Sequence, residues 1–243
     1  MVRDLNTLYL DCGNSRIKYS FADRSGFVAD LSDLEALLIR GNVSLVVIAS
    51  VSSQTTAIVQ LAESLTIATA VARVSDRFAG LSLVYPDVSL LGVDRWLAML
   101  AAIDLFPGQD IWVVDIGTAL TLDYVTKHRF HQGGSISVGL KLEAWTLSSK
   151  SARLPQADLE FSSVLGQTTA ACLNFGIVYG AVALIEQSVE KFGSDDSHVV
   201  LTGGDAELVA PHLNISHTIE PDLVLQGLKY YWHRIKAPTG DIE

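Results

Sequence analysis

Two short turns combine an aspartate, a glycine and small polar residues directly after an apolar, strand-like run. Glycine lacks the Cβ that would block an anion, so backbone N–H groups in such a turn can point at phosphoryl oxygens while the carboxylate holds a neutralising cation. A single turn of this kind is more often a solvated hairpin, but two in matching positions favour a phosphate-binding site. The candidate residues are Asp11, Gly13, Asn14, Ser15 and Lys18 in the first turn and Asp115, Gly117, Thr118 and Ala119 in the second.

A third candidate lies in LGVDRWLAMLAA, residues 91–102. Its apolar residues fall on one helical face, which turns Asp94 and Arg95 away from that face in the first turn. The simplest interpretation of Asp94 is a first-turn acid that the helix dipole stabilises by about 0.3–1 kcal/mol. The alternative is a carboxylate that orients an alcohol for phosphoryl transfer and accepts its proton late, for which a weakly basic group suffices.

The segment VVLTGGDAEL, residues 199–208, predicts a strand, a double-glycine turn and a helix that begins near Asp205. Gly203 and Gly204 would let a planar base or a ribose approach the backbone closely. A plain strand-to-helix junction has the same letters, so both interpretations stay open at this point.

The sequence lacks the motifs of several other kinds of active site. The sequence has no P-loop, no strand-following G-x-G-x-x-G and no G-x-S-x-G, and its six histidines show no paired-ligand spacing for zinc. Cys12 and Cys172 are too few for a disulfide framework, which predicts reduced thiols and a cytoplasmic protein. No histidine adjoins Cys12, so we expect a small buried residue there rather than a nucleophile.

The segments that position these residues alternate between strand-like and helix-like patterns, which predicts an α/β protein with sheets covered by helices. We expect the helix at 32–40 to begin with a capping box made by Ser32 and Glu35. The other elements expected in the first half are strands at 8–11, 17–23, 44–50 and 66–72 and a helix at 54–65.

Residues 111–125 repeat the layout of residues 8–21, with Asp115 standing 104 positions after Asp11. This repeat predicts a duplicated half-molecule with a cleft between the halves. Pro107-Gly108 is the expected boundary, giving halves 1–106 and 107–243, although the last helix could pack back on the first half. The later elements expected are a glycine turn at Gly133-Gly134, helices at 140–150, 167–191 and 222–235, and a strand at 199–202.

Length and composition bound the class of protein. A chain of 243 residues suits one large or two small domains, and 49% hydrophobic with 18% charged residues excludes a disordered or fibrous chain. The net charge of −10 argues against a nucleic-acid partner, which needs a basic face. No apolar run reaches the ~20 residues of a membrane span and the start lacks a signal-peptide pattern, so no membrane partner is expected.

Taken together, the motifs resemble those of type III pantothenate kinases, members of the acetate-and-sugar-kinase, heat-shock-chaperone and actin superfamily. The resemblance spans nearly the whole chain and implies duplicated ribonuclease H-like, actin-like ATPase domains with mixed sheets flanked by helices. In the family's order, the matching segments are DCGNSRIK (11–18), YPDVSLLGVDRW (85–96), DIGTALTLD (115–123), GGSISVGLKL (133–142), GQTTAACLNFG (166–176) and TGGDAEL (202–208).

The resemblance implies ATP-dependent phosphorylation of pantothenate to 4'-phosphopantothenate, the first step of coenzyme A biosynthesis. By position, Asp94 matches the catalytic base, Asp115 the ligand of a monovalent cation (K⁺ or NH₄⁺), and Asp11 the residue that organises Mg²⁺. The implied ATP-binding residues are Asp11, Cys12, Gly13, Asn14, Ser15, Arg16, Ile17, Lys18, Thr118, Gly203, Gly204 and Asp205. The implied pantothenate-binding residues are Tyr85, Gly92, Val93, Asp94, Arg95 and Thr169, with Thr168 as the alternative register.

The resemblance also implies a homodimer, for which the small-residue helix at 167–191 is the candidate interface. Two positions depart from the family pattern: Val138 stands where the family has proline, and Ser15 replaces the commoner threonine. Neither change removes a chemical group that the proposed site needs.

Two other functions remain open on the sequence. The first is a nucleotide-binding regulatory accessory factor of the same family without kinase activity, although such a protein has no need of the Asp94-Arg95 pair. The second is an ATPase or phosphatase of the superfamily, which would need no pocket for an acyclic acid.

Overall fold

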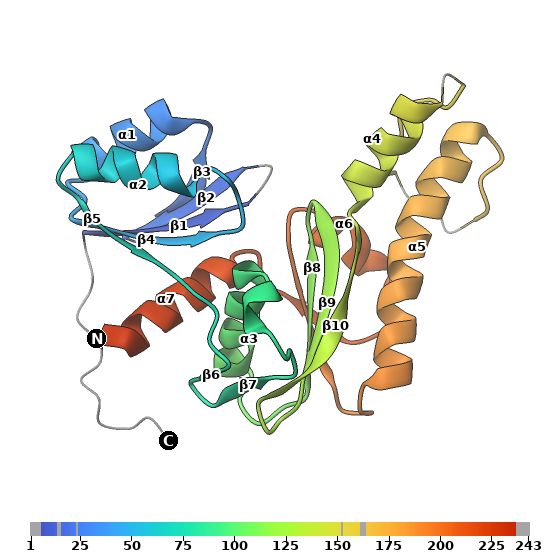
Figure 1. Cartoon of the computed structure of the whole chain (residues 1–243). Coiled ribbons are helices and arrows are strands. Elements are labelled where there is room, and N and C mark those ends of the chain that lie inside the picture. The colour runs from blue at the N-terminus through green and yellow to red at the C-terminus, as the bar shows by residue number, and fades with distance from the viewer. Residues whose placement is uncertain (1–5, 14–15, 23, 152, 161–163, 237–243) are drawn as a thin grey trace. The chain divides into compact units, whose positions relative to one another are not determined.

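The computed structural model describes residues 6–13, 16–22, 24–151, 153–160 and 164–236 (Figure 1). The chain divides into two compact units, here called the first and the second unit. The first unit comprises residues 1–104 and 223–243, and the second comprises residues 105–222. The C-terminal helix α7 (Leu223–Lys236) is therefore part of the first unit.

The first unit is built on a five-stranded mixed sheet in the order β3-β2-β1-β4-β5. Strands β1 to β3 form an antiparallel meander, and β4 and β5 run parallel to β1. Helices α1 and α2 cover one face of the sheet, and α7 packs against β1 and β4 (Figure 1). The bounds are β1 Thr7–Cys12, β2 Ile17–Phe21, β3 Arg24–Val28, α1 Leu31–Arg40, β4 Leu45–Ser50, α2 Thr55–Ser64 and β5 Ala68–Val71.

The N-terminus of α1 differs from the expected capping box. The cap is Asp30, whose carboxylate accepts hydrogen bonds from the backbone N–H groups of Ser32 (2.8 Å) and Asp33 (2.9 Å). The prediction that Ser32 and Glu35 cap this helix is therefore wrong. Because Asp30 already satisfies two of the free N–H groups, the helix begins earlier, at Leu31.

The second unit repeats this architecture with a mixed sheet in which five strands follow the order β12-β11-β8-β9-β10. Helices α4, α5 and α6 share one hydrophobic core with β8, β9 and β11. The bounds are β8 Ile111–Ile116, β9 Ala119–Val125, β10 Phe130–Val138, α4 Leu140–Lys150, α5 Thr169–Phe192, β11 His198–Thr202, α6 Ala206–Val209, η2 Ala210–His212 and β12 His217–Ile219.

The two sheets have the same pairing scheme, in which a hairpin strand and a parallel strand flank the first strand of each unit. Asp11 lies opposite Lys18 on β2 and beside Ala49 on β4. Asp115 occupies the equivalent place on β8, opposite Thr121 and beside Thr202. Each aspartate therefore stands near the end of a central strand, where the chain turns.

Two details of the second unit depart from the sequence prediction. Gly133 and Gly134 lie inside strand β10 rather than in a turn, and the register shifts between His131 and Gly133. Gly133 has φ +119°, so these residues form a β-bulge that needs glycine. The short strand β12 was not expected because three residues give too little alternation to recognise.

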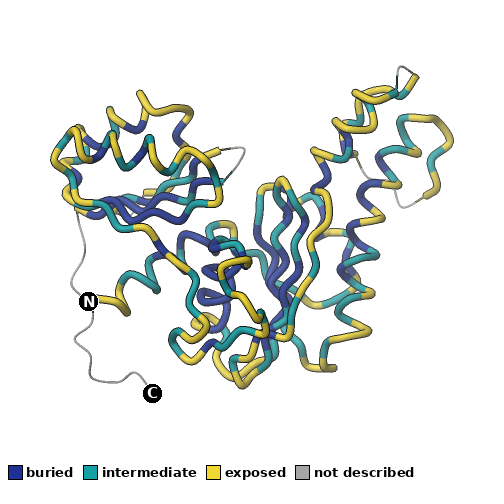
Figure 2. Tube along the Cα trace, in the orientation of Figure 1, coloured by how far each residue is buried: buried dark blue, intermediate teal, exposed yellow. Residues whose placement is uncertain are grey.

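The first unit also contains β6 (Arg77–Phe78), β7 (Leu81–Leu83), the 3₁₀ turn η1 (Val88–Leu90) and all but the last residue of helix α3 (Val93–Leu105). All residues of α3 from 95 to 103 are buried, as the dark tube in Figure 2 shows. The sequence predicted one apolar face for this helix, but the residues on its other side are buried as well. A Cβ on Gly227 of α7 would lie 1.9 Å from the Leu97 carbonyl oxygen, so the two helices touch at backbone distance.

Among the described residues, one helix, α5, is long and apolar enough to cross a membrane by length and composition, with a mean hydropathy of 1.5 over 18 residues. A single such helix is weak evidence, because a core helix of a globular protein meets the same criteria.

Candidate active site

The first aspartate turn closes the β1–β2 hairpin of the first unit. Asp11 is half-buried and lies opposite Lys18, which places a carboxylate and an ammonium-bearing side chain across one rung of the hairpin. Arg16 is exposed, with its guanidinium 4.9 Å from the centre of the Phe27 ring. Asn14 and Ser15, which were also expected to contact phosphate, lie outside the described residues.

Cys12, at the end of β1, is a buried core residue rather than a reactive thiol. Its side chain is 0% exposed and belongs to the core of the first unit. Burial, together with the neighbouring Asp11 carboxylate, raises the pKa of Cys12 to about 12. The thiol is therefore neutral at physiological pH, which confirms the sequence prediction and leaves only the backbone of Cys12 for a ligand.

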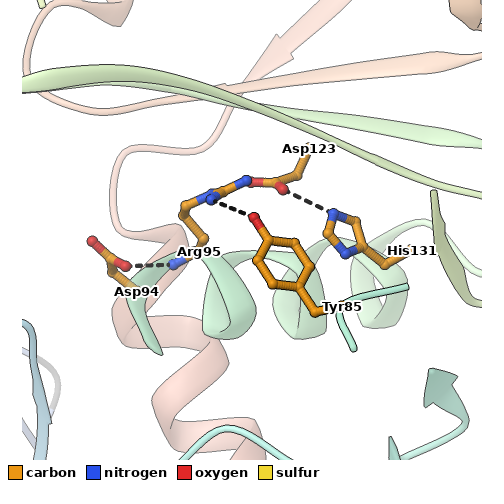
Figure 3. A network of polar contacts seen from close by, with 5 residues as sticks. All are labelled: Tyr85, Asp94, Arg95, Asp123 and His131. Atoms are coloured by element: carbon orange, nitrogen blue, oxygen red, sulfur yellow. Dashed lines mark hydrogen bonds and ion pairs between the residues drawn. The ribbon is translucent and has the colours of Figure 1, made fainter. Parts of the chain in front are cut away.

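The Asp94 carboxylate is held at the beginning of helix α3 by two features of its own segment. Its Oδ1 accepts a hydrogen bond of 2.8 Å from the backbone N–H of Arg95 (Figure 3). A Cβ on Gly92 would lie 2.4 Å from the same oxygen. The glycine therefore provides the space over which the carboxylate folds back, and a larger residue would displace it.

Arg95, the neighbour of Asp94, is buried with 8% of its surface exposed. Its Nη1 donates to the Tyr85 hydroxyl at 3.3 Å (Figure 3). Tyr85 and Arg95, which the family resemblance implies for one substrate site, are thus in contact.

The turn after β1 and the start of α3 meet at Val51. The Val51 N–H donates to the Cys12 carbonyl at 3.3 Å, and its Cγ1 would be 3.9 Å from a Cβ on Gly92. A cavity of about 470 Å³ opens beside this junction, lined by residues 50–51, 72–74 and 88–93. That volume is within the range of about 300–1,000 Å³ that is typical of small-molecule sites. Sequence reasoning did not find Val51 or the segment 72–74, because neither carries a motif.

In the second unit, the Asp115 turn is packed tightly against the double-glycine turn. Gly203 has φ +93°, and a Cβ there would lie 2.4 Å from both Asp115 Oδ1 and the Ile116 carbonyl oxygen. The Asp205 N–H also donates to the Ile116 carbonyl at 3.0 Å. The structure thus brings together the predicted residues Asp115, Gly203 and Asp205.

Thr118, in the same turn, is exposed, and its backbone is hydrogen-bonded to the junction between β10 and α4. The Gly139 N–H donates to the Thr118 carbonyl at 3.0 Å, and a Cβ on Gly139 would lie 2.0 Å from the Gly117 carbonyl oxygen. The motif at 133–142 contains this glycine, but sequence reasoning gave it no role. Its role in the structure is to let the chain pass directly over the second turn.

Asp205 is 5% exposed, and its Oδ1 is paired with the ammonium of Lys141, whose side chain is 64% exposed. A buried carboxylate needs such a partner because desolvation penalises an isolated charge. Lys141, the second residue of α4, was not predicted, although it belongs to the motif at 133–142. It places a positive charge beside the residues expected to bind the nucleotide.

Thr169 is the first residue of α5 and is exposed. The residue before it, Thr168, is the N-cap, and its hydroxyl accepts a hydrogen bond from the Ala171 N–H at 3.2 Å. Both threonines are exposed, and the Thr168 hydroxyl keeps its O–H donor while it accepts from Ala171, so both stay candidates for contact with a substrate.

Strands β9 and β10 also carry a buried polar pair. His131 Nε2 lies 2.9 Å from Asp123 Oδ1, and the two side chains are 0% and 1% exposed (Figure 3). This pair accounts for one of the six histidines as a residue of the core.

The side chains that would hold cations fit hard metal ions. Asp11 and Asp115 offer carboxylate oxygens, and the Ile116 carbonyl lies beside Asp115 at the same glycine. Oxygen ligands of this kind suit Mg²⁺ and K⁺. In the part of the chain that the structure describes, no group of three or more His, Cys, Asp and Glu could hold a metal. A cation here would therefore share its coordination with phosphate or water.

The family model for type III pantothenate kinase matches residues 7–191. This chain belongs to that family. A type III pantothenate kinase from Bacillus cytotoxicus is 33% identical over 159 residues, which cover 64% of this chain and 60% of the relative. The match thus spans less than two thirds of the relative's own length.

Solved structures agree on the fold. A conserved protein from Campylobacter jejuni assigned to the Baf family of transcriptional activators has a TM-score of 0.68 at 20% identity, covering 94% of this chain and 98% of its own. A Sinorhizobium meliloti protein assigned as a 2-dehydro-3-deoxygalactonokinase has a TM-score of 0.58 at 12% identity, covering 96% and 100%. At these identities the similarity shows the fold alone, which is that of the actin-like kinases.

Proposed function

We propose that this protein transfers the γ-phosphoryl group of ATP to the primary hydroxyl of pantothenate, the first step of coenzyme A biosynthesis. The observation that carries the proposal is the Asp94 carboxylate, fixed over Gly92 at the start of α3 beside a cavity of small-molecule size. Membership of the type III pantothenate kinase family supports the choice of substrates.

Asp94 is the proposed general base. The pantothenate oxygen attacks the γ-phosphorus, its proton passes to the Asp94 carboxylate, and the bond from the γ-phosphorus to the bridging oxygen breaks so that the electron pair leaves on ADP. The transition state of phosphoryl transfer is loose, so the main requirement is that the alcohol be aimed correctly. The hydrogen bond from the Arg95 N–H holds the carboxylate in the space that Gly92 leaves open. Tyr85 and Arg95 are the proposed contacts for the acceptor.

The phosphates of ATP are proposed to bind the Asp11–Lys18 turn and Thr118. Backbone N–H groups and the Lys18 ammonium supply the positive partners that the developing charge needs. Gly203, Gly204 and Asp205 are proposed to approach the nucleoside, with Lys141 holding the Asp205 carboxylate in place.

When bound, Mg²⁺ and K⁺ would neutralise phosphate charge. Asp11 is the proposed ligand of Mg²⁺, directly or through water, and Asp115 is the proposed ligand of the monovalent cation. The carboxylate and carbonyl oxygens that meet at Gly203 support the second assignment.

The Asp94→Asn variant tests the catalytic role. It preserves the size of the side chain and the hydrogen bond to the Arg95 N–H but removes the base, so we expect an unchanged melting temperature and a loss of turnover of about 10²–10⁴-fold. Pantothenate-dependent release of ADP measures this loss. Turnover of the Asn variant at the wild-type rate would show that Asp94 is not the base.

The assembly is proposed to be a homodimer formed through α5. This apolar helix keeps Cys172, Gly176, Tyr179 and Gly180 exposed along one stripe. No atom lies within 4 Å of the Cβ position of either glycine, so the backbone of a second copy could approach closely there.

A charge on this stripe tests the dimer. Tyr179 is 52% exposed, and Ile39 on α1 is 61% exposed, so Ile39→Glu is a matched control for Tyr179→Glu. By analytical ultracentrifugation we expect the wild type and Ile39→Glu at twice the chain mass of 26.2 kDa and Tyr179→Glu at the chain mass. A dimeric Tyr179→Glu variant would exclude this surface.

A further inference from the structure

We propose that Lys141 is a positioning residue that sets the selectivity of this protein for the ribose of its nucleotide. It holds one oxygen of the Asp205 carboxylate, so that the second oxygen is aimed to accept hydrogen bonds from ribose hydroxyl groups. The inference rests on the proposed function, in which Asp205 approaches the nucleoside, and it gives a role to a lysine that the family resemblance leaves without one.

Lys141 lies where α4 meets the two turns that are proposed to bind the nucleotide. It is the second residue of α4, and the N-cap of this helix, Gly139, donates its N–H to the Thr118 carbonyl at 3.0 Å. The ammonium of Lys141 is paired with the Asp205 carboxylate, which directly follows the double-glycine turn. Lys141 therefore links the start of α4 with both turns of the second unit.

The Asp205 carboxylate is not used by the helix that it precedes. Asp205 is the N-cap of α6, but its side chain makes no capping hydrogen bond. Its surface is 5% exposed, and its Oδ1 is the atom that Lys141 holds. In the described part of the chain, no residue donates a hydrogen bond to Oδ2. A largely buried carboxylate oxygen without a donor favours a ligand that supplies one.

The turn before Asp205 leaves room for a ribose. Gly204 is exposed and has no side chain, and Gly203 has φ +93°, a conformation that residues with a Cβ rarely adopt. A sugar can therefore come close to the backbone beside the carboxylate. The ribose of a nucleotide carries two neighbouring hydroxyl groups, each with an O–H donor, and an ionised carboxylate is a strong acceptor for them.

Lys141 supplies what this contact needs from the protein. Its positive charge offsets the cost of burying the negative charge of Asp205, and its hydrogen bond fixes the position of Oδ1. Because the two oxygens belong to one planar group, a fixed Oδ1 also fixes the direction of Oδ2. Without the lysine, the carboxylate could rotate away from the ribose toward solvent.

The test measures the dissociation constants of ADP and of dideoxy-ADP, which lacks both ribose hydroxyl groups, by isothermal titration calorimetry in Mg²⁺ and K⁺. ADP is chosen because it binds without turnover. Lys150 is an exposed lysine in the last turn of the same helix, so Lys150→Met controls for the change in net charge. The proteins compared with the wild type are Lys141→Met, Lys141→Arg, Lys150→Met, Asp205→Asn and the double variant Lys141→Met with Asp205→Asn.

We expect the wild type to bind ADP about 10- to 100-fold more tightly than dideoxy-ADP, which is the range for hydrogen bonds to a charged group. Lys141→Met should bring this ratio close to one by weakening the binding of ADP while dideoxy-ADP binds as before. Lys141→Arg should retain most of the ratio because it keeps the charge, and Lys150→Met should match the wild type.

The double variant tests whether the lysine acts through the carboxylate. Asp205→Asn should lose most of the ratio by itself. Adding Lys141→Met to it should then change the ratio no further, because the two residues form one interacting pair.

A wild-type ratio in Lys141→Met would overturn the proposal. So would an equal loss of affinity for both nucleotides, which is the result that a damaged fold or a contact of Lys141 with phosphate would give. A wild type that binds both nucleotides alike would overturn it too. Failure of the proposed function gives a different result, since ADP would then bind with the expected ratio while pantothenate would not stimulate the release of ADP from ATP.

Discussion

The Gly203→Ala variant tests whether the second unit holds Asp115 in a defined position. Gly203 has φ +93°, and the new Cβ would lie 2.4 Å from Asp115 Oδ1. An ordinary contact begins at 3.4 Å, so the carboxylate or the backbone must retreat by about 1 Å. Misplacement of a catalytic group by about 1 Å can reduce rate about 100-fold. We therefore expect a comparable loss in kcat/KM for ATP and weaker activation by K⁺.

Gly108→Ala is the matched control, because Gly108 has φ +76° and nothing lies within 4 Å of its Cβ position. Both variants carry the cost of a left-handed alanine, about 1–2 kcal/mol, which corresponds to a fall in melting temperature of roughly 2–8 °C for a chain of this size. Gly203→Ala alone should lose activity. If Gly203→Ala kept wild-type kinetics and the wild-type K⁺ response while its melting temperature fell as in Gly108→Ala, then Gly203 would not be what positions Asp115.

Four further predictions concern stability, thiol labelling and titration. Asp30→Ala should lower the free energy of unfolding by about 0.5–2 kcal/mol in urea melts while Ser32→Ala leaves it unchanged, because Asp30 is the cap of α1. Cys12, with its pKa raised to about 12, should resist iodoacetamide at pH 8 until the protein is unfolded, and native labelling would contradict its burial. Because burial favours the neutral thiol of Cys12 in the folded state, the free energy of unfolding should fall as pH rises from about 9 to 12. Burial lowers the pKa of His198, so the free energy of unfolding should fall as pH falls below 6.5, where the unfolded chain binds the proton more readily. Urea melts at several pH values measure this dependence, and His198→Gln should weaken it.

The strands and helices that hold the candidate site could largely be predicted from the sequence because each has a strong local pattern. The apolar runs before Asp11 and Asp115 predicted β1 and β8, and the repeated layout anticipated two sheets with the same pairing. Residue type predicted the wrong local structure where contacts with a distant segment decide the conformation. Gly133 looks like a turn residue, but pairing with β9 makes it a bulge within a strand.

Contacts between distant segments account for the site residues that sequence reasoning missed. Lys141 pairs with Asp205 across 64 positions, and Val51 lies against Gly92 although no motif links them. The segment 72–74 lines the cavity only because β5 ends beside the segment 88–93. These contacts between distant segments depend on the chain topology, and the local periodicity of the sequence does not predict them.

The proposed kinase activity is tested by measuring ADP release by the purified protein with and without pantothenate and with K⁺ exchanged for Na⁺. We predict release that depends on pantothenate, is faster in K⁺ than in Na⁺ and is accompanied by phosphorylated pantothenate. Release that ignores pantothenate would indicate an ATPase, and no release under any condition would indicate a nucleotide-binding regulator; either result would contradict the proposed kinase.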